Sequence, residues 1–441
     1  MLVLWAVVHI VARPGLQAGA GSAAHNLCSS IFVSGLPERQ VEEEMISLLV
    51  GATANLLQYR IDRNSRTVEA TLLSAHAKAV FVPGYGCRLD FGQTAPSLLS
   101  VENTPAVGDA FAPGNLVQTD IATLRTALDH EFDDTAAATP RHVKAIVIVK
   151  DGHVVAERYA DGFGLDTPVM SFSVAKSFTN ALLGILVRQG RIDMDKPAAV
   201  PEWEQGGDPR GKITSNDLLR MASGLDAAES GTGFDPASQM FYNADDMGGY
   251  GAQRPAHQAA QKEWDYTSVN TLLLDREIGK IVGGGPSGLR RFAESELFAP
   301  LGMHGVTLEF DGAGTFLGAS HVYAPARAFA RFGLLYLNDG LAPDGRRILP
   351  EGWVAYSRKS TLGSPYGAGF WTNDGPSKQA AWLVAHGFPK DGFFASGNLG
   401  QRIYIIPSER MIVARFGYSK GPDFAIEEDM ALISSSIAAL K

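Results

Sequence analysis

A serine and a lysine three residues apart stand at the start of an apolar stretch. Ser173 and Lys176 belong to the sequence Ser171–Ser177, which continues into apolar residues up to Gly190. On a helix, residues three apart share one face at about 5–6 Å between Cβ atoms, so the lysine amine can reach the serine hydroxyl. A helix N-terminus also offers unpaired N–H groups at the positive end of the dipole. The spacing predicts that Ser173 is a nucleophile, with a simple helix cap as the alternative.

A serine hydroxyl needs a base before it attacks a carbonyl. Lys176 can be that base only while it is neutral, a form that burial and the positive helix end both favour. A surface lysine is the structural alternative. Tyr266 lies further along the chain, just before the apolar run at 272–281. In the expected reaction, backbone amides hold the oxyanion that forms as the serine attacks the carbonyl, and an acyl-enzyme follows.

Several elements are expected around these residues. Asp151-Gly152 separates two β-forming runs, 144–150 and 154–159, which is a strong hairpin signal. A buried helix is expected over 174–189, closed by Gly190 as its C-terminal glycine. Further helices and strands are predicted at 272–281, 327–337, 400–407, 411–416 and 427–440.

The serial order of these pieces resembles the serine β-lactamase and penicillin-recognising family. The branch with the most similar motifs contains the class C-like esterases and the nylon-oligomer (6-aminohexanoate-dimer) hydrolases. The resemblance spans about 120–441 and is strongest over 171–195, 213–225, 264–273 and 393–407. It implies an α/β (α+β) fold, in which helices flank an antiparallel sheet and a mainly helical lobe lies at about 203–299.

Site roles follow from the resemblance position by position. Ser173 matches the acylated serine, Lys176 the motif lysine, and Tyr266 the tyrosine of a Tyr-x-Asn element. The resemblance makes Tyr266 the second candidate for the base, as a phenolate or as a proton relay, with a core tyrosine as the structural alternative. Which of Lys176 and Tyr266 is the base stays open. Ser268 stands where that element has asparagine and does not supply its amide; Ser268 and Gly397 are candidate substrate contacts. Tyr242 is a candidate substrate contact, because related hydrolases use a loop tyrosine.

Tyr250 is a candidate of the same kind, and ordinary packing is the alternative for both tyrosines.

The family's third motif, Lys-Thr-Gly or His-Thr-Gly, is absent at the expected place, where the chain has 395–401 instead. That form resembles the Gly-x-x-Gly-Gln turn of the nylon-oligomer branch. It implies that the amide of Asn398, following Gly397, completes an oxyanion hole with the amide of Ser173. An ordinary turn residue is the alternative for Asn398.

The expected function is cofactor-independent hydrolysis of a small-molecule ester or amide. Without a basic third motif to grip a carboxylate, β-lactams are less favoured substrates. A D-Ala carboxypeptidase or β-lactamase acting on cell-wall-type substrates is the alternative, and a non-catalytic binding protein that keeps the fold is the rival of another class. No metal site is expected, because the ten histidines are dispersed.

Composition limits the compartment and the partners. A net charge of −9 argues against nucleic acid or an anionic membrane as a partner. We expect residues 1–20 to be an export signal, although no basic residue precedes the apolar run; an N-terminal strand or anchor is the alternative. The protein is then periplasmic or secreted, and Cys28 and Cys87 could form a disulfide; otherwise it is cytoplasmic with two buried thiols. Membrane anchoring is not expected, and the sequence does not predict an oligomeric state.

The domain organisation follows from these observations. Residues 21–115 are expected to be an accessory segment that is β-rich from Asn26 to Gly92, with a hairpin at 56–72 and a linker over 94–115. Residues 116–441 are expected to be the hydrolase domain.

Overall fold

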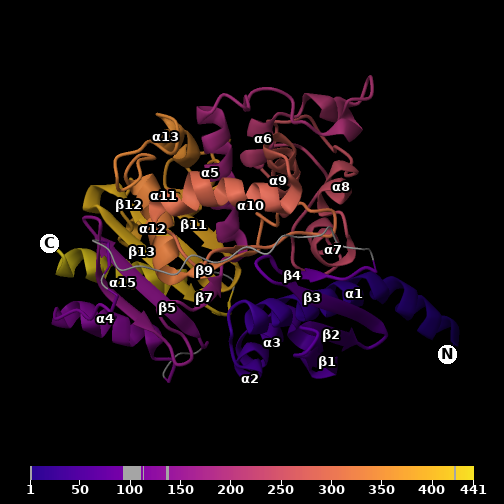
Figure 1. Cartoon of the computed structure of the whole chain (residues 1–441), viewed down its shortest axis with the longest axis horizontal. Helices are drawn as coiled ribbons and strands as arrows, with labels where there is room; N and C mark the ends of the chain where they lie inside the picture. Colours follow the sequence, from indigo (N-terminus) through magenta and orange to yellow (C-terminus); the bar gives the residue numbers. More distant parts are fainter. Residues whose placement is uncertain (1, 93–110, 113, 136–138, 422–423) are drawn as a thin grey trace. The chain divides into compact units, whose positions relative to one another are not determined.

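The computed structural model describes residues 2–92, 111–112, 114–135, 139–421 and 424–441, with side chains from residue 11 onward (Figure 1). Most of the expected linker over 94–115 lies outside the described residues. The chain forms two compact units, each assembled from separate segments. Unit 1 comprises Met1–Glu102, Lys196–Arg290 and Thr307–Leu317, and unit 2 comprises Asn103–Asp195, Arg291–Val306 and Gly318–Lys441. The N-terminal segment therefore shares a unit with most of the expected helical lobe.

Unit 2 is built on a six-stranded antiparallel sheet. Its strand order is β10-β11-β12-β13-β5-β6. The strands are β5 (Val143–Lys150), β6 (His153–Tyr159), β10 (Trp371–Thr372), β11 (Phe393–Gly397), β12 (Gln401–Ile406) and β13 (Met411–Gly417). Asp151 and Gly152 have φ of 49° and 84°, as a mirror-image hairpin turn requires. The predicted hairpin is therefore present.

Helices cover both faces of this sheet (Figure 1). On one face, α12 (Ala326–Leu337) approaches so closely that a Cβ on Gly333 would lie 2.9 Å from Ile403 Cγ2. On the other face, α4 (Ala122–Phe132) and α15 (Ile426–Ala439) share a core with residues such as Tyr404, since neighbouring strand residues point to opposite faces. The predicted fold class, helices flanking an antiparallel sheet, is confirmed.

Further elements of unit 2 lie around this core. The central helix α5 (Ala175–Arg188) packs on α12, where Phe178 stacks on Phe332 with ring centroids 4.0 Å apart. The short strand β7 (Pro168–Met170) pairs with β9 (Val322–Pro325). The remaining helices are α11 (Ala299–Leu301), α13 (Trp353–Arg358) and α14 (Lys378–Ala385).

Unit 1 begins with a long helix rather than with strands. Helix α1 runs over Leu2–Phe32, and the short helices α2 (Glu38–Val41) and α3 (Ser47–Val50) follow. The prediction of a β-rich segment over 26–92 is therefore wrong for 26–56, and strands begin only at Leu57. The predicted hairpin at 56–72 is present, within a sheet of β1 (Leu57–Asp62), β2 (Thr67–Leu72), β3 (Ala75–Val82) and β4 (Gly86–Leu89).

Small residues let α1 pack closely on its neighbours. A Cβ on Gly19 would lie 2.8 Å from the Leu72 side chain, and a Cβ on Gly21 would lie 2.9 Å from Tyr242 Cβ. The end of the segment expected to be an export signal lies inside this helix, with Ala18 and Ala20 buried. Among the residues that the structure describes, no helix has the length and apolar character needed to cross a membrane.

The rest of unit 1 is mainly helical. It contains α6 (Ser215–Leu219), α7 (Pro236–Asn243), α8 (Met247–Ala252) and α9 (Ser268–Val282), and α10 (Gly285–Ala293) begins in it. Helix α9 follows the segment that holds Tyr266.

Candidate active site

Ser173 lies in a tight turn before α5. Residues Phe172–Val174 form one 3₁₀ turn, and Ser173 is the only residue from 171 to 180 that is not fully buried. Phe172 has φ of 43°, in the left-handed region. Such a conformation costs a non-glycine residue about 1–3 kcal/mol and persists only where the surroundings enforce it. The buried Phe172 ring thus helps to hold the next residue at the surface.

The residue before this turn is fixed by a β-type ladder. Ser171 N donates to Val322 O at 2.9 Å, which continues the pairing of β7 with β9. The Ser171 hydroxyl accepts from Val322 N at 3.1 Å and donates to Ser320 O at 3.0 Å. Because the side chain and backbone of Ser171 are both engaged, the entry to the turn has little freedom.

Lys176 makes the contact that the sequence spacing predicts. Its Nζ donates to Ser173 Oγ at 3.0 Å and to Ala319 O at 2.9 Å. The side chain is only 2% exposed, so its terminal nitrogen lies inside the protein. The Nζ–Oγ distance is within the range needed for direct proton transfer.

Polar side chains fix the rotation of α5. Ser177 Oγ donates to Gly369 O at 2.7 Å, and Asn180 Nδ2 donates to Ala368 O at 2.8 Å. Both side chains are buried, so both bonds are protected from water. They hold the helix face on which Lys176 stands.

Gly397, at the end of β11, lies against the serine turn. A Cβ at Gly397 would be 2.4 Å from Ser171 O and 3.0 Å from Ser173 N. Asn398 follows by one peptide bond and is exposed. The Gly397 backbone therefore lies against the backbone amide of Ser173, one residue before the backbone amide of Asn398.

Tyr266 belongs to unit 1, whereas Ser173 belongs to unit 2. Tyr266 is partly exposed, in the segment that enters α9. On its N-terminal side, Asp265 N donates to Met221 O at 2.8 Å. On its C-terminal side, Thr267 caps α9 by accepting from Val269 N at 3.2 Å. The tyrosine is thus held between two anchored neighbours.

The other expected substrate contacts lie in unit 1. Ser268 is buried, and its backbone N donates to the Glu229 carboxylate. The Tyr242 hydroxyl is bonded to Ser22 and Asn26 of α1, and burial raises the pKa of Tyr242. These contacts place the Tyr242 hydroxyl in the interior of the unit.

Tyr250 is half-buried on α8. The Arg254 guanidinium lies over its ring, 5.8 Å from the centroid. This is a cation–π contact within the unit.

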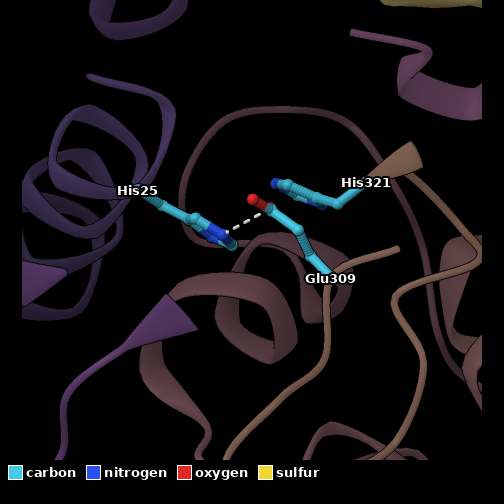
Figure 2. Close-up of side chains that lie close together, drawn as sticks. All are labelled: His25, Glu309 and His321. Atoms are coloured by element: carbon cyan, nitrogen blue, oxygen red, sulfur yellow. Dashed lines mark hydrogen bonds and ion pairs between the residues drawn. The ribbon is translucent and has the colours of Figure 1, made fainter. Parts of the chain in front are cut away.

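A buried polar cluster lies near the cysteines, and no sequence pattern predicted it. Cys28 and Cys87 form a disulfide that joins α1 to β4. Beside it, the buried Glu309 carboxylate accepts from Ser29 Oγ at 2.7 Å and from Cys87 N at 2.6 Å. His25 Nε2 lies 2.9 Å from the same carboxylate (Figure 2). The close-up also draws His321, which belongs to unit 2.

Comparisons with known proteins agree with this architecture. A family model described as Beta-lactamase matches residues 129–434. A 6-aminohexanoate-dimer hydrolase from Paenarthrobacter ureafaciens is 24% identical over 325 residues, covering 69% of this chain and 78% of that protein. The N-terminal segment before residue 129 lies outside the family match.

Two solved structures show the same fold. One is a Bacillus anthracis protein provisionally assigned as a 6-aminohexanoate-dimer hydrolase; it has a TM-score of 0.58 and 21% identity, covering 75% of this chain and 87% of that one. The other is a penicillin-binding protein homologue from Caulobacter crescentus, with a TM-score of 0.57 and 19% identity, covering 74% and 99%. At these identities the likeness concerns the fold alone.

Proposed function

Because this chain belongs to the Beta-lactamase family, we propose that it is a serine hydrolase that cleaves an ester or amide bond through an acyl-enzyme on Ser173. The observation that carries the proposal is the 3.0 Å contact between Lys176 Nζ and Ser173 Oγ. It occurs in a turn where the serine alone is accessible. The general pattern is an activated nucleophile beside its base.

Lys176 is suited to take the serine proton. A neutral amine has two N–H bonds and one lone pair, and Ala319 O accepts one N–H at 2.9 Å. That bond orients the nitrogen, so the lone pair can face the Ser173 hydroxyl. The proton moves to Nζ as Oγ attacks the carbonyl carbon, and the carbonyl oxygen becomes an oxyanion.

Two backbone amides, those of Ser173 and Asn398, are proposed to bind this oxyanion. The closeness of Gly397 to Ser173 N supports the pairing. In other acyl-transfer enzymes, one such donor contributes about 10²–10³ in rate. Tyr266 is proposed to carry the proton to the leaving group or to share the role of base with Lys176; water then hydrolyses the acyl-enzyme.

Amides and esters without a carboxylate next to the scissile bond are the proposed substrates. The relative from Paenarthrobacter ureafaciens is named for hydrolysing the 6-aminohexanoate dimer. The third-motif position here carries Ser396, Gly397 and Asn398, none of which supplies a cation. The disulfide between Cys28 and Cys87 supports an oxidising compartment. We therefore propose a periplasmic or secreted enzyme.

Active-site labelling tests the nucleophile. The wild type, incubated with a fluorophosphonate, is expected to gain one adduct by intact mass, and Ser173→Ala none. Ser295→Ala, which changes an exposed serine, is the matched control and should be labelled like the wild type. An unlabelled wild type, or the same adduct on Ser173→Ala, would refute the proposal.

The base and the substrate need separate measurements. Lys176→Met is expected to slow labelling at least 100-fold, whereas Lys390→Met, at an exposed lysine, should not change it. If Tyr266→Phe slows labelling and Lys176→Met does not, tyrosine is the base. A panel of p-nitrophenyl esters, linear amides, D-Ala peptides and β-lactams then distinguishes the substrate classes.

A further inference from the structure

In the turn after β11, three consecutive backbone carbonyls each accept a hydrogen bond from a neighbouring residue of the protein. Asn398 O accepts from Gln401 Nε2 at 3.1 Å, and Leu399 O accepts from Ser419 N at 2.9 Å. Gly400 O accepts from Arg415 Nη1 at 2.9 Å. The orientation of each peptide plane from residue 398 to residue 401 is therefore fixed by a separate donor.

The backbone of this turn would not adopt its shape unaided. Leu399 has φ of 58° and Gly400 has φ of 87°, so two successive residues are left-handed. Leucine in this region is strained by about 1–3 kcal/mol. The hydrogen bonds to the three carbonyls offset this strain, and they present the outer side of the turn, with Asn398, to solvent.

Burying the charged guanidinium group of Arg415 is energetically unfavourable. Its side chain is fully buried on β13, directly opposite the buried Arg402 on β12. Asp429 of α15 supplies the counter-charge: its Oδ2 lies 2.9 Å from Arg402 Nη1, and its Oδ1 lies 3.4 Å from Arg415 Nε. A buried ion cluster gives little net stability compared with apolar packing, so stability alone explains this arginine poorly.

The bonding of Arg415 indicates its role. Besides Nη1 on Gly400 O, its Nη2 donates to Ser419 Oγ at 2.6 Å. Ser419 is also the residue whose backbone N holds Leu399 O. The planar guanidinium therefore joins two supports of one turn, a task for which the single ammonium of a lysine has the wrong geometry.

We propose that Arg415 is a positioning residue for the reaction, which fixes the Asn398 amide in the oxyanion hole by holding the turn at Gly400 and Ser419. This inference rests on the proposed function. Asp429 keeps the guanidinium in place from α15, so the C-terminal helix is linked to the site through buried charges.

Arg415→Met and Arg415→Lys test the proposal against Arg402→Met and Arg402→Lys as matched controls. The control arginine is equally buried and shares Asp429, but its Nη1 donates to Phe424 O. Both Arg415 variants are expected to lose about 10–100-fold in kcat for a p-nitrophenyl ester, with KM within threefold, because a donor misplaced by about 1 Å costs up to 10² in rate. The Arg402 variants should keep kcat within threefold whatever their Tm.

A second readout is independent of catalysis. Hydrogen exchange of the amides of residues 398–401 should accelerate at least tenfold in Arg415→Lys and stay unchanged in Arg402→Lys. If Arg415→Met does not fold, the lysine variant, which keeps the charge beside Asp429, decides alone.

The outcomes separate the two claims. A wild type that fluorophosphonate does not label at Ser173 refutes the proposed function, and the inference falls with it. If the wild type is labelled but Arg415→Lys keeps its kcat and its exchange rates, only the inference is refuted. Equal loss of kcat in the Arg402 and Arg415 variants also refutes it, since that result indicates a general structural role.

Discussion

Replacing Gly397 by alanine is expected to disable the proposed oxyanion hole while the fold survives. The new Cβ would lie 2.4 Å from Ser171 O, 3.0 Å from Phe172 Cβ and 3.0 Å from Ser173 N. None of these atoms belongs to a flexible side-chain end. The end of β11 or the serine turn must therefore move.

The size of the movement sets the size of the effect. Ordinary contact begins near 3.4 Å, so Gly397 and Ser171 must separate by about 1 Å. A misplacement of that size costs about 10² in rate, and complete loss of one oxyanion donor costs about 10²–10³. We therefore expect kcat/KM of Gly397→Ala to fall 10²- to 10³-fold.

Ester hydrolysis, measured together with thermal unfolding, checks this prediction. Gly164→Ala is the matched control, because its nearest non-neighbouring atom would be Thr167 Oγ1 at 4.0 Å. The control should keep kcat/KM within twofold. The reasoning is refuted if Gly397→Ala keeps kcat/KM within threefold, or if its loss of activity only follows a loss of folded protein.

Three further predictions concern stability. Burial raises the pKa of Glu131 to about 7 from 4.5, so the folded carboxyl keeps a proton that the unfolded chain releases, and stability falls as pH rises from 4.5 to 7 by up to ~3 kcal/mol. Glu131→Gln should therefore raise Tm at pH 8 and leave it unchanged at pH 5 by calorimetry; an equal change at both pH values contradicts this. The Cys28–Cys87 bond closes a separation of 59 residues, so its reduction should cost about 4 kcal/mol in urea unfolding, and a change below 1 kcal/mol would contradict the loop argument. Glu309→Ala leaves the buried donors of Ser29 and Cys87 without their acceptor and should cost roughly 2–5 kcal/mol in the same assay; a near-neutral result would mean that these donors find other partners.

Local patterns carried most of the successful predictions. The Asp151-Gly152 hairpin, the buried helix before Gly190 and the contact of Ser173 with Lys176 each depend on neighbours in sequence. Periodicity and turn chemistry determine such features within a few residues. The proposed role of Asn398 came from the family resemblance, because no local sequence pattern predicts that β11 ends beside the serine turn.

The failures have two physical causes. Helix α1 was missed beyond Asn26 because its small residues show little amphipathic contrast and are buried on all sides. The roles of Arg415 and Glu309 were missed because charged residues are expected at the surface, whereas both side chains are buried. Glu309 also accepts from Cys87 N, 222 residues away in the sequence. Which partners a buried charged side chain meets depends on the topology of the fold, which local sequence patterns do not predict.

The position of Glu309 in the chain also sets an order of events during synthesis. Glu309 is 222 residues beyond Cys87 in the sequence, and its carboxylate accepts a hydrogen bond from the Cys87 backbone amide. At about 5–20 residues per second, a ribosome needs roughly 10–45 s to cover that interval. Throughout this time the acceptor for the buried donors of Ser29 and Cys87 has not been made. The last internal hydrogen bonds of unit 1 therefore wait for a late segment of the nascent chain.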